Sequence, residues 1–180
     1  ILENITLPNS ITTIKNDAFA YCGNLTNVTL PNKLITIEGG AFGACEKLRS
    51  IKIPQSVTSI GNQAFFNCSN LASVSIGNTF GTSNLTSIGH TAFKSCKLSG
   101  ITIPLKVTFI GYEAFSNNTN LTKVTCLNTR PSNVSFNTSG KWNAFGSNTS
   151  LTITIPKRGV GYITADGWKE YEDKIIKSSF

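Results

Sequence analysis

The chain of 180 residues contains no methionine, one histidine, and nine acidic residues against sixteen lysines and arginines. No apolar run approaches the roughly 18 residues of a membrane-spanning helix, so we expect no transmembrane segment. The five cysteines form no Cys-x-x-Cys pair and no Cys/His cluster, which argues against a metal site. With so few histidines and acids, neither a Ser-His-Asp triad nor a carboxylate pair is favoured, and we predict a noncatalytic protein without a cofactor.

The sequence contains instead a repeating unit of 23 residues, represented by LRSIKIPQSVTSIGNQAFFNCSN at 48–70. Its segment Ile51–Ile53 alternates apolar and polar residues, as a strand with one buried face does. A second short β-branched segment, Val57–Ile60, lies between Pro54 and Gly61. Pro54 can close the first strand, and we expect Gly61 at a corner with positive φ.

The remainder of the unit is too short for an ordinary helix. We expect a single helical or 3-10 turn that inserts Phe65 into the core as a wedge, with Cys68 beside it. Because one unit cannot bury its own apolar face, the copies must stack. The sequence therefore predicts a β-rich solenoid, a leucine-rich repeat stack of about seven coils with parallel β-strands, short helical or 3-10 turns and a C-terminal helical cap.

The copies define the expected domain organisation. Units begin near Leu2, Leu25, Leu48, Leu71, Leu98, Leu121 and Leu151. The fourth carries an insertion, GNTFGTSN, and the sixth contains TRPSNVSFNTSGKW, which has the composition of an exposed loop. We place the solenoid at 1–156 and a capping segment at 157–180, where Trp168 takes the place of the phenylalanine wedge. Because no cap precedes Leu2, we expect a fragment of a longer protein.

The string Ala-Phe-x-x-Cys-x-x-Leu-x-x-Ile-x-Ile-Pro-x-Ser-Val-x-x-Ile-Gly, repeated between Leu2 and Pro156, resembles the BspA-type leucine-rich repeat. The resemblance implies a secreted or surface protein of the kind found in bacteria and protozoa and commonly regarded as an adhesin. It implies no enzymatic role. An extracellular or cell-surface location is therefore expected.

Two columns of equivalent residues should run through the stack. The phenylalanine column is core, and the cysteine column comprises Cys22, Cys45, Cys68 and Cys96. Stacked strands lie about 4.8 Å apart, within the reach of a disulfide. However, side chains in register point the same way, so a reduced, packed ladder is favoured, with Cys126 buried alone. We place His90, the single histidine, at an exposed corner.

Outward positions of the first strand form rows that are candidates for binding: Asn4, Thr6, Asn27, Thr29, Ser50, Lys52, Ser73, Ser75, Thr102, Lys123 and Thr125. Serine and threonine also suit an exposed strand that binds nothing. The irregular loops supply three further candidates, Phe80, Arg130 and Phe136, because loops on a rigid scaffold often carry function.

These features predict a noncatalytic extracellular interaction or adhesion module. The alternative is a structural spacer or stalk that displays another domain. The expected partner is a host or extracellular-matrix protein or a glycan, and we expect a monomer with no specific nucleic-acid partner. The net charge of +7 either keeps the surface soluble or steers an acidic partner toward it.

Overall fold

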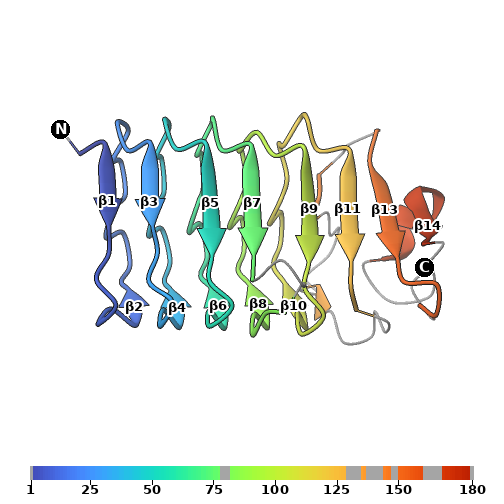
Figure 1. The fold of residues 1–180 in the computed structure, drawn as a ribbon. Coiled ribbons are helices and arrows are strands. Elements are labelled where there is room, and N and C mark those ends of the chain that lie inside the picture. Colours follow the sequence, from blue (N-terminus) through green and yellow to red (C-terminus); the bar gives the residue numbers. More distant parts are fainter. Residues whose placement is uncertain are drawn as a thin grey trace.

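The computed structural model describes residues 2–77, 82–128, 135–136, 144–146, 150–159 and 168–178. In these residues the chain winds into a parallel β-solenoid of about six turns. The strands stand side by side along the long axis, and the two ends of the chain lie at opposite ends of the molecule (Figure 1). The predicted fold class is confirmed.

The first strand of each copy contributes to one long face of the solenoid. These strands are β1 (Asn4–Thr6), β3 (Asn27–Thr29), β5 (Ser50–Ile53), β7 (Ser73–Ile76), β9 (Gly100–Ile103), β11 (Lys123–Cys126) and β13 (Thr152–Ile155). The pairs are parallel and in register, so that Ile51 lies beside Val74 and Val124 beside Ile101. The hydrogen-bonded ladder is interrupted between β3 and β5 and between β7 and β9, although the strands remain neighbours.

The second strands of the first six copies form an unbroken six-stranded parallel sheet. It contains β2 (Thr13–Ile14), β4 (Thr36–Ile37), β6 (Ser59–Ile60), β8 (Ser87–Ile88), β10 (Phe109–Ile110) and β12 (Ser135–Phe136). Strand β12 falls in the sixth copy, within the stretch predicted to be an exposed loop. Phe136 pairs with Ile110, so its backbone continues the repeat, and the loop interpretation of this residue is wrong.

A third face is made by the segments that carry the phenylalanines. In the first five copies they are turns rather than the predicted helical or 3-10 turns, because each contains two residues with left-handed backbone, such as Gln63 (φ 58°) and Asn67 (φ 56°). A left-handed residue interrupts any right-handed helix. Alternate amides of the turn bond to the next coil, as when Phe65 N–H donates to Ala92 O at 2.8 Å, and the amides between them bond within the turn, as when Phe66 N–H donates to Gln63 O at 2.9 Å.

Glycine is required at position 61 because the backbone of the preceding coil approaches closely, and not because φ is positive. A Cβ atom at this position would lie 2.6 Å from the backbone nitrogen of Gly39 in the preceding coil. The equivalent glycines, Gly89 and Gly111, approach the preceding backbone equally closely. The positive φ lies two residues later, at Gln63. The expectation of a positive φ at Gly61 was therefore wrong.

The core is a column of stacked aromatic rings. Phe42, Phe65, Phe93, Phe115 and Phe145 are fully or almost fully buried. Successive ring centroids from Phe19 to Phe145 are 5.0 to 5.5 Å apart, with planes within 14° of parallel. The phenylalanine wedge predicted from the sequence is present in the first six copies, and the stacked rings help to hold the coils together.

The cysteine column lies beside the phenylalanines, and none of the five cysteines forms a disulfide. Three of the thiols, those of Cys45, Cys68 and Cys96, donate to the carbonyl of a phenylalanine in the preceding coil, as from Cys68 Sγ to Phe42 O at 3.1 Å. In the fifth copy Asn118 replaces cysteine and keeps the same bond, donating to Phe93 O at 2.8 Å. The reduced ladder is confirmed, and its members are hydrogen-bond donors as well as packed groups.

The C-terminal end differs from the predicted helical cap. The described part contains a 3-10 helix, η2 (Lys169–Lys174), which is kinked at Tyr171, and then a strand, β14 (Ile175–Lys177), which pairs with β13. No α-helical cap is seen in these residues. Trp168 is fully buried and lies 6.4 Å from Phe145, ring centroid to ring centroid, at the end of the aromatic column. None of the described helices has the length and apolar character needed to cross a membrane.

Candidate functional site

The outer surface of the first sheet gathers the predicted strand residues on one face of the molecule. Strand β5 alternates exposed and buried residues, so Ser50 and Lys52 face the solvent while Ile51 and Ile53 enter the core. Parallel pairing in register extends this alternation across the coils. All eleven predicted strand residues are exposed except Thr125, which is half-buried: Asn4, Thr6, Asn27, Thr29, Ser50, Lys52, Ser73, Ser75, Thr102, Lys123 and Thr125.

The polar side chains at the N-terminal end of this face bond to one another. Asn27 Nδ2 donates to Asn4 Oδ1 at 2.7 Å, and Thr26 Oγ1 donates to Glu3 O at 3.0 Å. These bonds join neighbouring coils, and each amide retains further hydrogen-bonding capacity toward the solvent. These outward polar side chains therefore help to join neighbouring coils, and they also remain available as a polar surface.

A groove of about 640 Å³ lies at the C-terminal end of the same face. Lys123 and Thr125 of β11, Thr154 of β13, and Ile176 and Lys177 of β14 contribute to its lining. Two of these residues were predicted from the sequence. Ile176 and Lys177 were missed because a helical cap was expected where β14 joins the sheet, and Thr154 was missed because the outward rows were followed only to the sixth copy.

A second hollow, of about 480 Å³, lies at the corner below the fourth and fifth copies. Its polar groups bond to one another: Lys106 Nζ donates to Asn84 Oδ1 at 2.8 Å, and Thr82 Oγ1 donates to Gln55 Oε1 at 3.3 Å. The exposed Leu105 replaces a polar residue of the other copies at this corner. Because its polar groups are already partnered, this hollow offers less to a ligand than the groove does.

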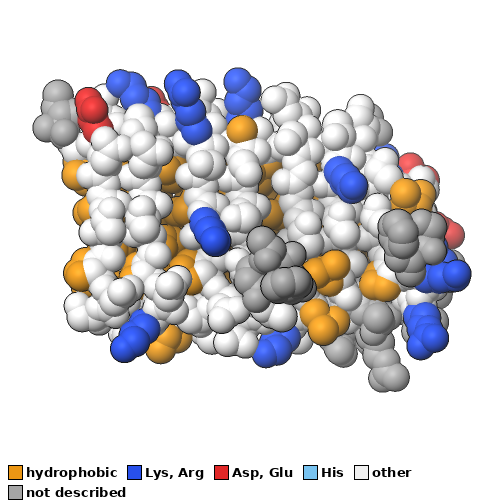
Figure 2. Space-filling model, in the orientation of Figure 1, with side chains coloured by type: hydrophobic (Ala, Val, Ile, Leu, Met, Phe, Trp, Pro, Cys, Tyr) orange, Lys and Arg blue, Asp and Glu red, His pale blue; other side chains and the backbone are white. Residues whose placement is uncertain are grey.

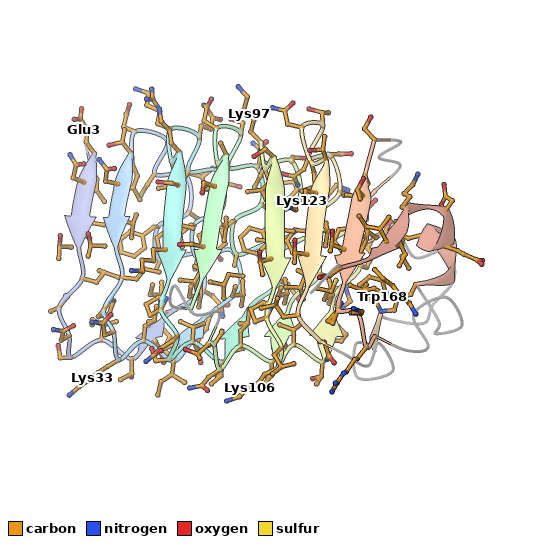
Figure 3. The ribbon with its side chains drawn as sticks, turned by 45° about the vertical axis from the view of Figure 1, so that its right-hand side comes forward. Glu3, Lys33, Lys97, Lys106, Lys123 and Trp168 are labelled. Atoms are coloured by element: carbon orange, nitrogen blue, oxygen red, sulfur yellow. The ribbon has the colours of Figure 1, made fainter. Side chains whose placement is uncertain are left out.

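The charge of the face is positive. Between Lys47 and Arg158 the only acidic residue is Glu113, and it forms an ion pair with Lys94. No described carboxylate pairs with Lys52 or Lys123, which stand on β5 and β11. Figure 2 shows acidic side chains only toward the two ends of this face, and Figure 3 shows Lys123 projecting from the sheet.

His90 has a structural role at its corner. The ring Nδ1 atom of His90 accepts the backbone N–H of Tyr112 at 2.9 Å, and the backbone N–H of His90 donates to Asn62 Oδ1 at 2.9 Å. The ring also packs edge-on against Phe109. The half-buried His90 thus repeats in the fourth copy the bond that Asn62 makes in the third, and it is less exposed than predicted.

The thiols are poor nucleophiles at neutral pH. Desolvation raises the pKa of Cys45 and of Cys96 to about 12, and raises that of Cys68 and Cys126 further. Since the thiolate is the reactive form, these cysteines are packed donors. Within the part of the chain that the structure describes, no three His, Cys, Asp or Glu side chains gather to hold a metal ion.

The three candidates from irregular loops are not placed on the face. Phe80 and Arg130 lie outside the described residues, and Phe136 is described only through its backbone in β12. The candidate site is the outer surface of the first strands of the copies, which we call the strand face.

A family model described as the BspA type leucine rich repeat region matches residues 1–122 and 81–166, with six copies. The chain belongs to the BspA-type leucine-rich repeat family. This confirms the resemblance seen in the repeat. No curated protein matches the chain at a significant level.

Solved structures share the fold of this BspA-type chain. A leucine-rich repeat protein from Bacteroides ovatus has 27% identity and a TM-score of 0.61, over 87% of this chain and 51% of that one. The T. pallidum leucine rich repeat protein has 30% identity and a TM-score of 0.66, over 74% and 59%. A leucine rich cell surface protein from Faecalibacterium prausnitzii, 21% identical with a TM-score of 0.57 over 89% and 56%, shares the fold. The BspA-type chain thus spans between half and three fifths of these structures.

Proposed function

We propose that this chain is a noncatalytic interaction module of a cell-surface protein and that it binds its partner through the strand face. The observation that carries the proposal is the continuous surface of small polar and basic side chains from β1 to β11, which ends in a groove. Stacked repeats commonly build extended binding surfaces of this kind. A core of stacked rings supports the face from within.

The partner we propose is a host or extracellular-matrix protein or a glycan that presents acidic groups. The lysines on the strand face have no described carboxylate partner, and the net charge is +7. An acidic partner would be attracted at long range and held by short-range contacts on the face. The surface location follows from the family resemblance and is part of the proposal.

Two features support a noncatalytic role. The pKa of the buried thiols is raised, so little thiolate forms, and the Nδ1 atom of His90 accepts a structural hydrogen bond. Neither group is then disposed to act as a nucleophile or a general base.

The test is a binding screen of the chain against extracellular-matrix proteins and sulphated glycans at low and high salt. Saturable binding that survives the higher salt supports a shaped surface, whereas attraction between exposed charges alone is screened away. Thr102→Glu changes the strand face, and Thr108→Glu makes the same substitution at an exposed position near the second sheet. We expect the first variant to weaken binding several-fold and the second to leave it unchanged.

Two results would contradict the proposal. Equal losses in both variants would mean that binding follows net charge and not the strand face. An absence of binding to any tested partner would instead favour the spacer or stalk, in which the solenoid displays another domain.

A further inference from the structure

The groove at the end of the strand face is built by three adjacent strands. Thr125 of β11 lies beside Thr154 of β13, which lies beside Ile176 of β14. Thr154 forms the middle of this row, and Ile176 has an exposed fraction of 52% despite its apolar side chain. The groove continues to Leu127 and Pro156 at the ends of β11 and β13.

The lining is mostly apolar and includes two lysines. The methyl groups of the threonines, Leu127, Pro156 and Ile176 are apolar, and Lys123 and Lys177 supply the charges. Its volume of about 640 Å³ lies within the range of ligand-binding pockets, which are usually apolar with a few polar groups. Neither lysine has a carboxylate partner among the described residues.

We propose that this groove binds an extended peptide segment of a partner protein in which apolar side chains alternate with acidic ones. The inference rests on the proposed function, since it names the partner chemistry of one part of the strand face. Aliphatic side chains of the peptide would cover Thr154 and Ile176, and its carboxylates would meet Lys123 and Lys177 at the rim. Partial removal of water strengthens such charge pairs.

A peptide suits the groove better than a glycan does. A sugar carries many hydroxyl groups, and each needs a hydrogen-bond partner once it is removed from water. Among the described residues, the lining has no aromatic ring and no carboxamide or carboxylate side chain; its polar side chains there are threonine, serine, cysteine and lysine. The groove thus supplies apolar area and positive charge, which is what an apolar and acidic peptide requires.

The experiment titrates the whole chain with a fluorescent peptide of alternating leucine and glutamate. Two control peptides replace either every glutamate by glutamine or every leucine by serine. We expect saturable binding of the first peptide and a loss of affinity of about tenfold or more for each control. Equal binding of all three peptides would overturn the proposal.

Variants of the chain then locate the site. Thr154→Trp fills the middle of the groove and Lys123→Glu reverses a charge at its rim; both should reduce affinity at least tenfold. Lys33→Glu is the matched control, because it makes the same change at an exposed lysine outside the strand face and the groove. Ile176→Glu alters an already exposed side chain, so it tests the groove even if Thr154→Trp perturbs folding, which thermal unfolding would reveal.

The outcomes separate this inference from the proposed function. If Lys33→Glu weakens peptide binding as much as Lys123→Glu does, the attraction is general and the groove is not the site. If a sulphated oligosaccharide binds where the peptide does not, and Thr154→Trp abolishes that binding, the peptide assignment is overturned in favour of a glycan. If a partner from the screen binds the groove variants normally, the groove proposal fails while the binding module stands.

Discussion

At the scale of single residues, the cysteine column shows how one position both packs and donates a hydrogen bond. Cys96 Sγ donates to Phe65 O at 3.2 Å in a buried environment. Asn118 makes the equivalent bond one coil later and satisfies its remaining polar atoms locally, for example by accepting the N–H of Leu98. Cysteine and asparagine are interchangeable here because the carbonyl of the preceding phenylalanine needs a donor.

Burial of these thiols makes stability depend on alkaline pH. The pKa of Cys96 is raised from 9.0 to about 12 in the folded chain, because burial removes the thiolate from water. Between these values the unfolded chain binds fewer protons than the folded one, so the free energy of unfolding falls as pH rises. At a pH of about 10.5 the loss is roughly 2 kcal/mol for this thiol.

Urea unfolding of the wild type and of Cys96→Ser, from about pH 8 to about 10.5, measures this effect. Serine retains a donor for Phe65 O but does not ionise in this range. We expect the wild type to lose about 2 kcal/mol more than the variant over the interval. Parallel pH profiles for the two proteins would show that Cys96 does not titrate as argued.

Several residue roles could not be predicted from one sequence. The position of Gly61 beside a Pro-bounded strand indicated a corner. Glycine is needed there, however, because Gly39 of another coil approaches closely. In the same way, His90 looked like an exposed corner residue until its Nδ1 was seen to accept the Tyr112 N–H. Both contacts join residues of different coils, so the local pattern carries no sign of them.

At the scale of elements, the turn that carries the phenylalanine should be the most sensitive part of each copy. Phe65 is fully buried between Phe42 and Phe93, whereas its neighbour Phe66 is 37% exposed. We expect Phe65→Ala to lower the free energy of unfolding by about 3–5 kcal/mol. Phe66→Ala, the matched control, should cost less than about 1 kcal/mol. Chemical denaturation measures both changes in the free energy of unfolding. Equal losses would contradict the assignment of Phe65 as the buried wedge.

The spacing between turns depends on glycine at one corner. In Gly61→Ala the new Cβ would lie 2.6 Å from Gly39 N, so neighbouring coils must separate. We expect a loss of about 1–3 kcal/mol, as for other overpacked sites. Gly23→Ala is the control, because nothing lies within 4 Å of its added carbon, and thermal unfolding should show little change. A neutral Gly61→Ala would contradict the close-approach explanation.

Among the elements, those that recur were predictable and those that depart from the repeat were not. The apolar alternation at Ile51 and Ile53 is read correctly from any copy because the same core surrounds every copy. The final segment has no second copy to support it. Its Ile175-Ile176-Lys177 run is β-branched, as a strand prefers, but the preceding acidic and basic residues made a helix the better local choice. Pairing with β13 decided the outcome.

At the scale of the whole molecule, stability should vary along the stack. Each coil contacts mainly its neighbours, so an end can open without the middle. Trp168 closes the aromatic column at the C-terminal end, packed beside Phe145 and near Tyr171, whose hydroxyl accepts the Phe145 N–H at 3.2 Å. We expect Trp168→Ala to cost about 3–5 kcal/mol and to act locally.

Hydrogen exchange distinguishes local from global loss in this variant. Amides of β13 and β14 should exchange faster, by the factor that corresponds to the free energy lost in the variant. Amides of β5 and β6 should keep the protection of the wild type. A uniform rise in exchange from β2 to β14 would show that the solenoid unfolds as one unit and that Trp168 supports all of it.

The direction of the hydrogen bonds between coils has a mechanical consequence. These bonds run along the long axis, and the two ends of the chain lie at opposite ends of that axis (Figure 1). Tension between the ends therefore pulls neighbouring coils directly apart, one after another. A coil that occupies about 4.8 Å of the stack holds 23 residues, which extend to about 75 Å once released. Under load the solenoid is an extensible tether, which lengthens in steps before it breaks.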